Sequence, residues 1–178
     1  GECIRATVLG ASQYSVQLSG RTSYFSDPRV VLPRRNLQVV SPSYTLGETV
    51  DPDDLAAAIR GHLTAFDIDG ANADVALAFR WHGSPSHERL LGFACGVVRG
   101  LGERIHRGLP TCLVLDGDVA LTIGSILRDE LGVDGDLLVI DGVRLSDFDY
   151  VDIGRLREPS HTVPVTIKSL VFGQDPGG

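Results

Sequence analysis

Two short apolar runs, Leu113-Val114-Leu115 and Leu137 to Ile140, constrain the fold of this chain more than any other part of its sequence. A strand that is apolar along its whole length has to be covered on both faces, as strands are in the parallel sheets of α/β proteins. Helical patterns precede and separate these two runs. The sequence therefore predicts one α/β domain in which helices flank a mixed sheet.

The first predicted helix follows Asp51-Pro52. Aspartate is a favoured N-cap residue, and proline is favoured at the first helical position, so this pair is a helix start signal. The apolar residues after it fall on one face of a helix, at Leu55, Ile59, Leu63 and Phe66.

A second helix is predicted to open at Ser84-Pro85, and Gly92, Gly96 and Gly100 recur along it every four residues. Glycine lowers helix propensity, but it lets a neighbouring element approach the helix backbone closely. We therefore expect another element to pack tightly against this helix. A third helix is expected from about Val119 to Leu131.

The first 25 residues are expected to form an antiparallel meander of three short strands. These strands are Ile4 to Leu9, Ser15 to Ser19 and Thr22 to Phe25, with breaks at Gly10-Ala11-Ser12-Gln13 and Gly20-Arg21. A loop with Asp27-Pro28, Pro33 and Pro42, interrupted by the apolar run Leu37 to Val40, is expected next, and later strands are predicted at Val75 to Trp81, Tyr150 to Ile153 and Val165 to Phe172. Residues 1–172 are thus expected to form one domain, followed by a flexible tail at 173–178.

The composition narrows the classes of protein to which the chain can belong. It has 178 residues, starts at Gly1 and contains no Met, so we expect it to be part of a longer protein. Its net charge of −7 argues against binding to DNA or RNA. No apolar run approaches the roughly 20 residues that cross a bilayer, so no membrane partner is expected. Three widely spaced cysteines, Cys3, Cys95 and Cys112, predict free thiols in the cytoplasm and no metal site.

The turn expected at Gly10, Ala11, Ser12 and Gln13 is the first candidate binding site. Small residues allow backbone N–H groups to converge on an anion, as they do in phosphate-binding hairpins. An ordinary hairpin turn explains the same residues, and both interpretations stay open from the sequence alone.

Asp116, Gly117 and Asp118 form the second candidate site, because they stand between a buried strand and a helix. Ligands of open α/β sheets bind beyond the carboxyl ends of such strands, and Gly117 leaves room for one. We expect Asp118 to N-cap the next helix. The Asp116 carboxylate is then available to a hydroxyl, an amide or a metal ion.

Other polar residues are interpreted as structural. Asp141, Asp147, Asp149 and Asp152 are expected in a solvated loop, because their spacing is not that of a calcium-binding loop. Trp81, the only tryptophan, is expected to be half buried at the end of a strand rather than to anchor a partner. The sequence contains no Walker phosphate loop, Gly-x-Ser-x-Gly elbow or His-x-x-x-His pair, so no catalytic residue is assigned.

Seven segments resemble, in order, the C-terminal part of the ethanolamine ammonia-lyase reactivating factors, the ethanolamine-utilisation A family. They are Ile4 to Ser12, Leu18 to Gly20, Arg35 to Leu37, Ala76 to Trp81, Leu113 to Asp118, Phe148 to Gly154 and Val163 to Phe172. No single segment is diagnostic, but together they extend over nearly the whole chain.

This resemblance implies a fold and a cofactor. The family is similar to the actin, sugar-kinase and heat-shock-ATPase (ASKHA) superfamily, in which two ribonuclease H-like halves hold ATP between them. This chain would be the second half of an actin-like ATPase, and the first half would precede it in the same protein. By the same resemblance, Gly10 to Gln13 would bind phosphate, Asp116 to Asp118 would bind adenosine, and the cofactor would be ATP with magnesium.

The resemblance also implies a function for the full-length protein. Such a factor uses ATP to eject damaged cobalamin from inactivated ethanolamine ammonia-lyase, so that intact adenosylcobalamin can enter. The lyase would be the partner of this chaperone-like factor. The expected location is the cytoplasm, with an ethanolamine-utilisation microcompartment as one setting.

Two departures from the superfamily pattern keep a second interpretation open. Val8 stands two residues before Gly10, where an acid is usual, and Asp118 follows Gly117, where a small residue is usual. The alternative is an actin-like half-domain that binds no nucleotide and acts as a protein-interaction module. A small-molecule kinase is a weaker third interpretation, because no catalytic base stands beside a recognisable substrate pocket.

Overall fold

The computed structural model describes residues 7–68 and 74–173, which contain one eight-stranded sheet in the order β1-β8-β7-β3-β4-β5-β6-β2. The strands are β1 (Thr7–Ser19), β2 (Tyr24–Phe25), β3 (Arg34–Val40), β4 (Val75–Arg80), β5 (Thr111–Asp116), β6 (Leu137–Asp141), β7 (Asp149–Ile153) and β8 (Thr162–Gly173). The helices are α1 (Pro28–Val31), α2 (Pro52–Ala65), α3 (His87–Gly100), α4 (Gly102–His106) and α5 (Ala120–Ser125), and α5 continues as a π-helix over Ile126–Glu130.

Strands β3, β4, β5 and β6 are parallel neighbours at the centre of the sheet, and each face of them contributes to a separate hydrophobic core. Leu113 and Leu115 of β5 belong to one core, whereas Val114 between them belongs to the other. All three side chains are fully buried. The prediction that the apolar runs are covered on both faces is confirmed, and the sheet is mixed as expected.

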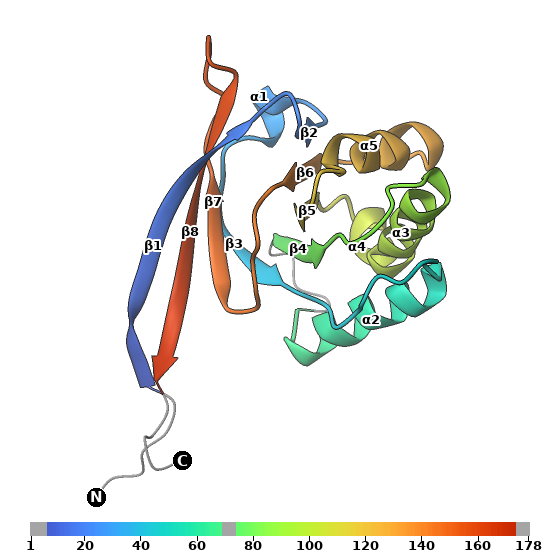
Figure 1. Ribbon diagram of the computed structural model, residues 1–178, viewed down its shortest axis with the longest axis horizontal. Coiled ribbons are helices and arrows are strands. Elements are labelled where there is room, and N and C mark those ends of the chain that lie inside the picture. Colours follow the sequence, from blue (N-terminus) through green and yellow to red (C-terminus); the bar gives the residue numbers. More distant parts are fainter. Residues whose placement is uncertain (1–6, 69–73, 174–178) are drawn as a thin grey trace, which may run out of the picture.

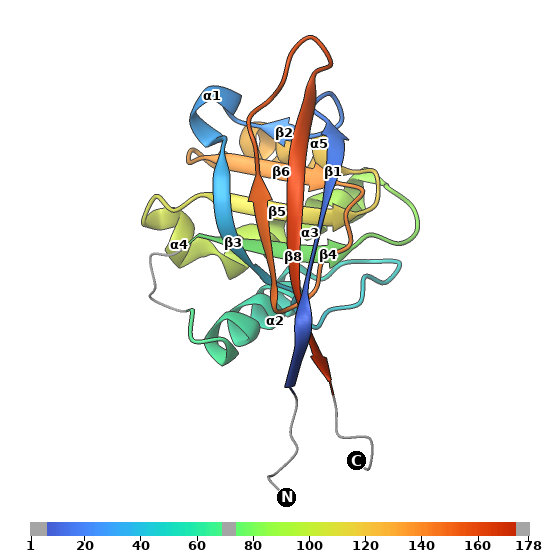
Figure 2. The ribbon, with the colours of Figure 1, turned by 90° about the vertical axis from the view of Figure 1, so that its left-hand side faces the viewer.

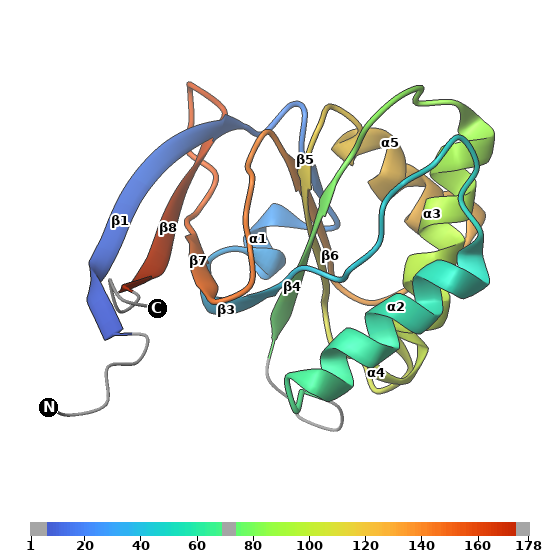
Figure 3. The ribbon, with the colours of Figure 1, turned by 60° about the horizontal axis from the view of Figure 1, so that its bottom comes forward.

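The two faces of the parallel strands are covered by different kinds of element. Helices α2, α3 and α5 lie on one face, and the antiparallel strands β1, β8 and β7 lie over the other (Figure 1). Figure 2 shows these antiparallel strands running across β4, β5 and β6, and Figure 3 shows β1 on the opposite side of the molecule from α2, α3 and α5. Strand β3 joins the two halves because it pairs with both β4 and β7. The sheet thus curls over itself, and the three helices α2, α3 and α5 flank only one of its faces, whereas Val31 of the short α1 joins the core on the other face.

Helix α2 begins as the sequence predicts. Asp51 is the N-cap, its side chain accepts a hydrogen bond from the Asp53 N–H at 2.9 Å, and Pro52 is the first helical residue. The predicted apolar face is buried at Leu55, Ile59 and Leu63. A side-chain cap of this kind contributes about 1 kcal/mol to helix stability.

Helix α2 packs against the glycines of α3. A β-carbon added at Gly96 would be 2.6 Å from Leu55 Cδ2, and one at Gly100 would be 2.8 Å from Ile59 Cβ. Both distances are shorter than a carbon–carbon contact, so only glycine fits at these positions. The expectation of a tightly packed neighbour is confirmed, and that neighbour is α2.

The predicted N-terminal meander is wrong. Residues 10–13 lie within the continuous strand β1, in which Ser12 is opposite Ser169 and Ser19 is opposite Thr162 of β8. Gly10 marks a shift in this pairing, as at a β-bulge, and not a turn. Strand β2 pairs instead with β6 at the far edge of the sheet, where Tyr24 is opposite Val139. Small residues fit a bulge as well as a turn, and the pairing of β1 with the distant strand β8 decides for the bulge.

Some predictions fall outside the described residues, namely Cys3, the start of the first strand at 4–6, and the tail beyond Gly173. Cys95 and Cys112 are free thiols. Within residues 7–68 and 74–173, no helix is both long and apolar enough to span a membrane.

Candidate functional site

Ionisable residues end three neighbouring parallel strands. Strand β4 ends at Arg80, β5 at Asp116 and β6 at Asp141, all at the same edge of the sheet. Open α/β sheets bind ligands beyond this carboxyl edge. The second predicted site therefore lies at an edge that is suited to binding.

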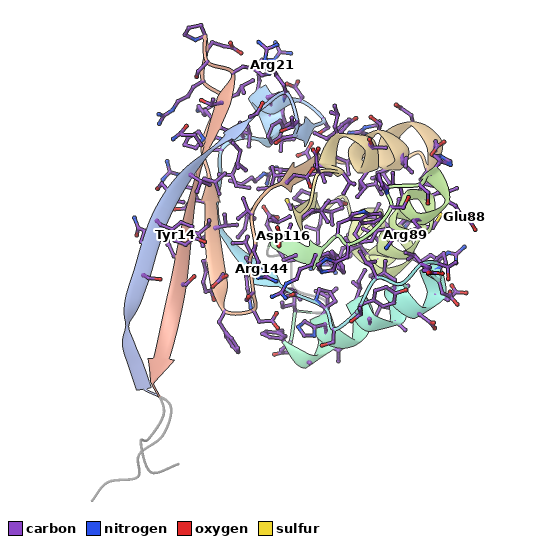
Figure 4. All side chains as sticks on the ribbon, in the orientation of Figure 1. Tyr14, Arg21, Glu88, Arg89, Asp116 and Arg144 are labelled. Atoms are coloured by element: carbon purple, nitrogen blue, oxygen red, sulfur yellow. The ribbon has the colours of Figure 1, made fainter. Side chains whose placement is uncertain are left out.

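The Asp116 carboxylate is accessible at this edge. Its side chain is 41% exposed, and Oδ2 lies 3.6 Å from Arg144 Nε, which is itself 57% exposed. Figure 4 shows Asp116 and Arg144 side by side, with Arg89 nearer the helices. An exposed ion pair at this distance contributes little to stability. The carboxylate is thus free to exchange Arg144 for another partner.

Gly117 is required by packing within the domain. A β-carbon at this position would be 2.8 Å from Trp81 Cβ, which is too close for any other residue. The backbone N–H of Trp81 also donates a hydrogen bond to the backbone carbonyl oxygen of Asp116 at 3.2 Å. The glycine in this turn is therefore explained by the neighbouring strand end, whether or not a ligand binds there.

Asp118 does not cap the next helix, contrary to the prediction. The N-cap position of α5 is Val119, and the cap is provided from another strand by Asp141, whose Oδ2 accepts a hydrogen bond from the Ala120 N–H. Asp118 is exposed. A cap supplied by a residue more than 20 positions away leaves no local signal in the sequence, whereas Asp118 is the acid next to the helix start.

Asp141 is an unusual carboxyl group. Burial raises its pKa from 3.8 to about 6, against the opposing effect of hydrogen bonds from the Ala120 and Val119 N–H groups, and the Asp118 charge raises it further. Its Oδ1 is buried and has no hydrogen-bond partner among the described residues. The group therefore titrates closer to neutrality than an ordinary aspartate.

The first predicted site, residues 10–13, is not a phosphate-binding hairpin. These residues lie in the middle of β1, and the Ser12 and Gln13 side chains are exposed on that strand. Four strands, β8, β7, β3 and β4, separate β1 from β5 in the sheet. In Figure 4, Tyr14 of β1 is well apart from Asp116. The structure therefore does not bring the two predicted sites together.

The sequence predicted that the remaining acids of the 141–152 segment are solvated, but in the structure they make hydrogen bonds within the protein. Asp147 accepts hydrogen bonds from the Ser41 N–H at 2.7 Å and from His62 Nε2 at 3.0 Å, which attaches the loop after β6 to β3 and α2. Asp149 binds the Ser146 N–H and the Ser169 hydroxyl, and Asp152 binds the Asn36 N–H and Lys168. Each acid therefore joins two elements.

Two adjoining cavities lie beyond the ends of β3 and β4. The larger has a volume of about 580 Å³ and the smaller about 260 Å³, and they share Leu46 and His82. The larger cavity is lined by Gly47, Glu48, His82, Ser84, Ser86 and Arg89. Arg80, which ends β4, lines the smaller cavity. A volume of several hundred Å³ is in the range of small-molecule sites.

Arg89 is the buried charge of the larger cavity. It is 5% exposed, and it is one turn inside α3, whose N-cap is Ser86, two residues beyond the predicted helix start. Its guanidinium lies over the ring of Trp81, with Cζ 4.7 Å from the ring centroid. Trp81 itself is 8% exposed, so it is more deeply buried than predicted.

The sequence does contain a signal for Arg89. Arg89 precedes Phe93 and Val97 by one and two turns of the helix, so a charged residue stands on the buried face of α3. A charge on an apolar face indicates either an internal partner or a ligand. Glu48 and His82 carry no comparable signal, because they lie in loops that only the tertiary fold brings together.

Comparison with known proteins places this chain in a family. The sequence model of the family described as ethanolamine utilisation protein EutA matches residues 1–173. Two curated proteins named ethanolamine ammonia-lyase reactivase EutA, from Salmonella typhimurium LT2 and Escherichia coli K12, are 33% and 32% identical to it over 171 residues. These matches cover 96% of this chain but 34% of each relative, and no solved structure matches significantly. The chain belongs to the EutA family of ethanolamine utilisation proteins.

Proposed function

We propose that this chain is a domain of an ATP-dependent, chaperone-like factor that releases damaged cobalamin from inactivated ethanolamine ammonia-lyase. The observation that carries the proposal is the 33% identity, over 96% of the chain, to a protein named ethanolamine ammonia-lyase reactivase EutA. The chain spans about a third of that relative's length. Reactivation, the use of ATP and the lyase partner therefore concern the full-length protein.

The described residues fit ATP with magnesium only in part. Asp116 offers an accessible carboxylate that could accept a hydrogen bond from a ribose hydroxyl, but residues 10–13 form no phosphate-binding turn. Within the described ranges, no cluster of three or more His, Cys, Asp or Glu side chains is placed to hold a metal ion. We therefore assign the phosphates and the magnesium ion to the rest of the protein. The ribonuclease H-like, actin-like half stays a prediction.

A second candidate function is an interaction module that binds no nucleotide. It is favoured by the positions of Asp118 and Asp141, whose carboxyl groups interact beside the predicted adenosine-binding turn. Negative charges at this edge repel the phosphates of a nucleotide. In this version, the domain recognises the lyase while the rest of the protein uses ATP.

The proposed function is tested with the full-length protein that contains this chain and with ethanolamine ammonia-lyase inactivated by a cobalamin that lacks its adenosyl group. We expect added adenosylcobalamin to restore lyase activity only when the factor, ATP and magnesium are all present. Recovery at the same rate without the factor contradicts the proposal.

A truncated factor without this domain separates the two candidate functions. If the domain is an interaction module, truncation abolishes binding to the lyase and leaves ATP binding unchanged. If the domain completes the nucleotide site, truncation weakens ATP binding as well. Isothermal titration with magnesium-ATP and with the inactivated lyase measures both.

A further inference from the structure

The Arg89 guanidinium is buried without a neutralising partner. Nε donates a hydrogen bond to the Gly47 carbonyl oxygen at 3.0 Å, and Nη1 donates one to the Ser84 carbonyl oxygen at 2.6 Å. Both partners are uncharged, as is the Trp81 ring over which the guanidinium lies. In the part of the chain that the structure describes, no ion pair includes Arg89. An interior charge without a counter-charge is unfavourable, so it requires an explanation.

This guanidinium keeps unused donors and belongs to a residue that lines a cavity. A guanidinium has five N–H donors, and the two bonds to carbonyl groups use one on Nε and one on Nη1. Nη2 has no hydrogen-bond partner among the described residues, and Arg89 lines the cavity of about 580 Å³. The Nη1 and Nη2 edge is the edge that binds two oxygens of a carboxylate or a phosphate in parallel. The two carbonyl groups and Trp81 thus hold this edge in a fixed position.

Two more basic residues adjoin the larger cavity, although the chain as a whole carries a net charge of −7 and one acid is also in the lining. His82 lines both cavities and Arg80 lines the smaller one, whereas Glu48 is the acid among the lining residues of the larger one. The amino end of α3 begins at Ser86 in the same lining, and the helix dipole adds partial positive charge there.

We propose that the cavity of about 580 Å³ lined by Arg89 binds a small molecule through an oxyanion of the carboxylate or phosphate class. Two oxygens of the anion bind the Nη1 and Nη2 edge of Arg89, and His82 and the Ser84 and Ser86 hydroxyls lie on the rim. The bound anion supplies the counter-charge that the fold lacks. This site is separate from the reactivation proposed above and does not depend on it.

Trp81 provides a direct measurement of binding, because it is the only tryptophan of the chain and contacts Arg89. Inorganic phosphate and succinate are titrated separately into the 178-residue chain, with sodium chloride added to keep the ionic strength constant. Trp81 fluorescence emission and the melting temperature of the chain are measured at each anion concentration. We expect a saturating change in emission, and a rise in melting temperature, with at least one of the two anions. A change that stays linear in anion concentration is a general salt effect and overturns the proposal.

Three variants assign the binding to this cavity. Arg89→Lys keeps the charge but loses the two-donor edge, and we expect it to bind at least about tenfold more weakly. Glu48→Gln removes the acid from the exposed rim, and we expect tighter binding. Arg144→Gln removes an exposed cation outside the cavity lining, and we expect unchanged affinity.

Glu48→Gln keeps the proposal testable if Arg89→Lys does not fold, because Glu48 is exposed and its replacement leaves the core intact. The proposal is overturned if wild type and Glu48→Gln bind the anion with equal affinity. It is also overturned if Arg144→Gln loses as much affinity as Arg89→Lys, because the anion then binds elsewhere. A response to phosphate but not to succinate, or the reverse, supports the site and identifies which oxyanion it accepts.

Discussion

Gly96 of α3 lies against Leu55 of α2 so closely that a β-carbon on Gly96 would be 2.6 Å from Leu55 Cδ2. This contact brings together the two longest α-helices of the described domain, which form one side of the main hydrophobic core. The absence of a side chain on Gly96 lets the backbone of α3 approach α2, and this contact sets the distance between the two helices.

We therefore expect Gly96→Ala to destabilise the domain by about 1–3 kcal/mol, the range for overpacking of a core, although alanine has the higher helix propensity. Gly61→Ala is the matched control, because Gly61 is in the exposed part of α2 and has no atom within 4 Å of its added β-carbon. It should stabilise the domain by about 0.5–1 kcal/mol. Urea unfolding of both variants measures the two effects, and a stabilised Gly96→Ala contradicts the interface.

Asp141 should make stability depend on pH between about 4 and 6. Its pKa is about 6 in the folded chain and near 3.8 when the chain is unfolded, so the folded state holds the proton more tightly in this interval. Stability contributed by the protonated group is therefore lost as the pH rises from about 4 to about 6, and nothing further is lost above that range.

Asp141→Asn removes this titration and keeps an oxygen that can accept the Ala120 N–H. The free energy of unfolding of wild type should fall relative to Asp141→Asn between pH 4 and pH 6, and the difference should be constant above pH 7. Urea unfolding across this range measures the difference. A difference that is the same at all pH values shows that the carboxyl has an ordinary pKa.

Cys112 should be unreactive in the native protein. Complete burial raises the pKa of its thiol to about 12, so at pH 8 only about one molecule in ten thousand carries the thiolate that reacts. We expect wild type and Cys112→Ala to show the same number of rapidly labelled thiols when native. In denaturant, wild type should show one more thiol than the variant. Fast native labelling that disappears in Cys112→Ala contradicts the burial.

Asp116 should affect nucleotide binding and not stability, if the turn after β5 contacts ATP. Asp116→Ala in the full-length protein is expected to weaken ATP binding by about 1–3 kcal/mol, the range for losing a hydrogen bond to a charged group. Its melting temperature should barely change, because the Arg144 pair is exposed.

Asp134→Ala is the control for this change in charge, because Asp134 is exposed and precedes β6 at the opposite end of the parallel strands. It should leave ATP affinity unchanged. Unchanged affinity in Asp116→Ala as well removes Asp116 from the nucleotide site and favours the interaction module. Calorimetric titration and a melting curve on the same samples give both quantities.

The sequence by itself determined the features that depend on neighbours within a few residues. The Asp51 cap with Pro52 fixed the start of α2, the spacing of apolar residues fixed its buried face, and the apolar run at Leu113 fixed a strand covered on both sides. The recurrence of glycine in α3 also indicated the close helix contact. In each case the signal, a cap, an apolar helical face or an apolar run, is contained within the segment.

Only the tertiary structure decided which strands pair and which loops meet. Tyr24 pairs with Val139 and Ser12 with Ser169, and these partners lie more than 100 residues away along the chain. Strand pairing depends on backbone hydrogen bonds that any residue except proline can donate, so the small residues at 10–13 fitted a turn and a bulge equally well. For the same reason, the sequence located Asp116 at a strand end but did not reveal the cavity around Arg89, whose lining comes from loops separated by some 40 residues.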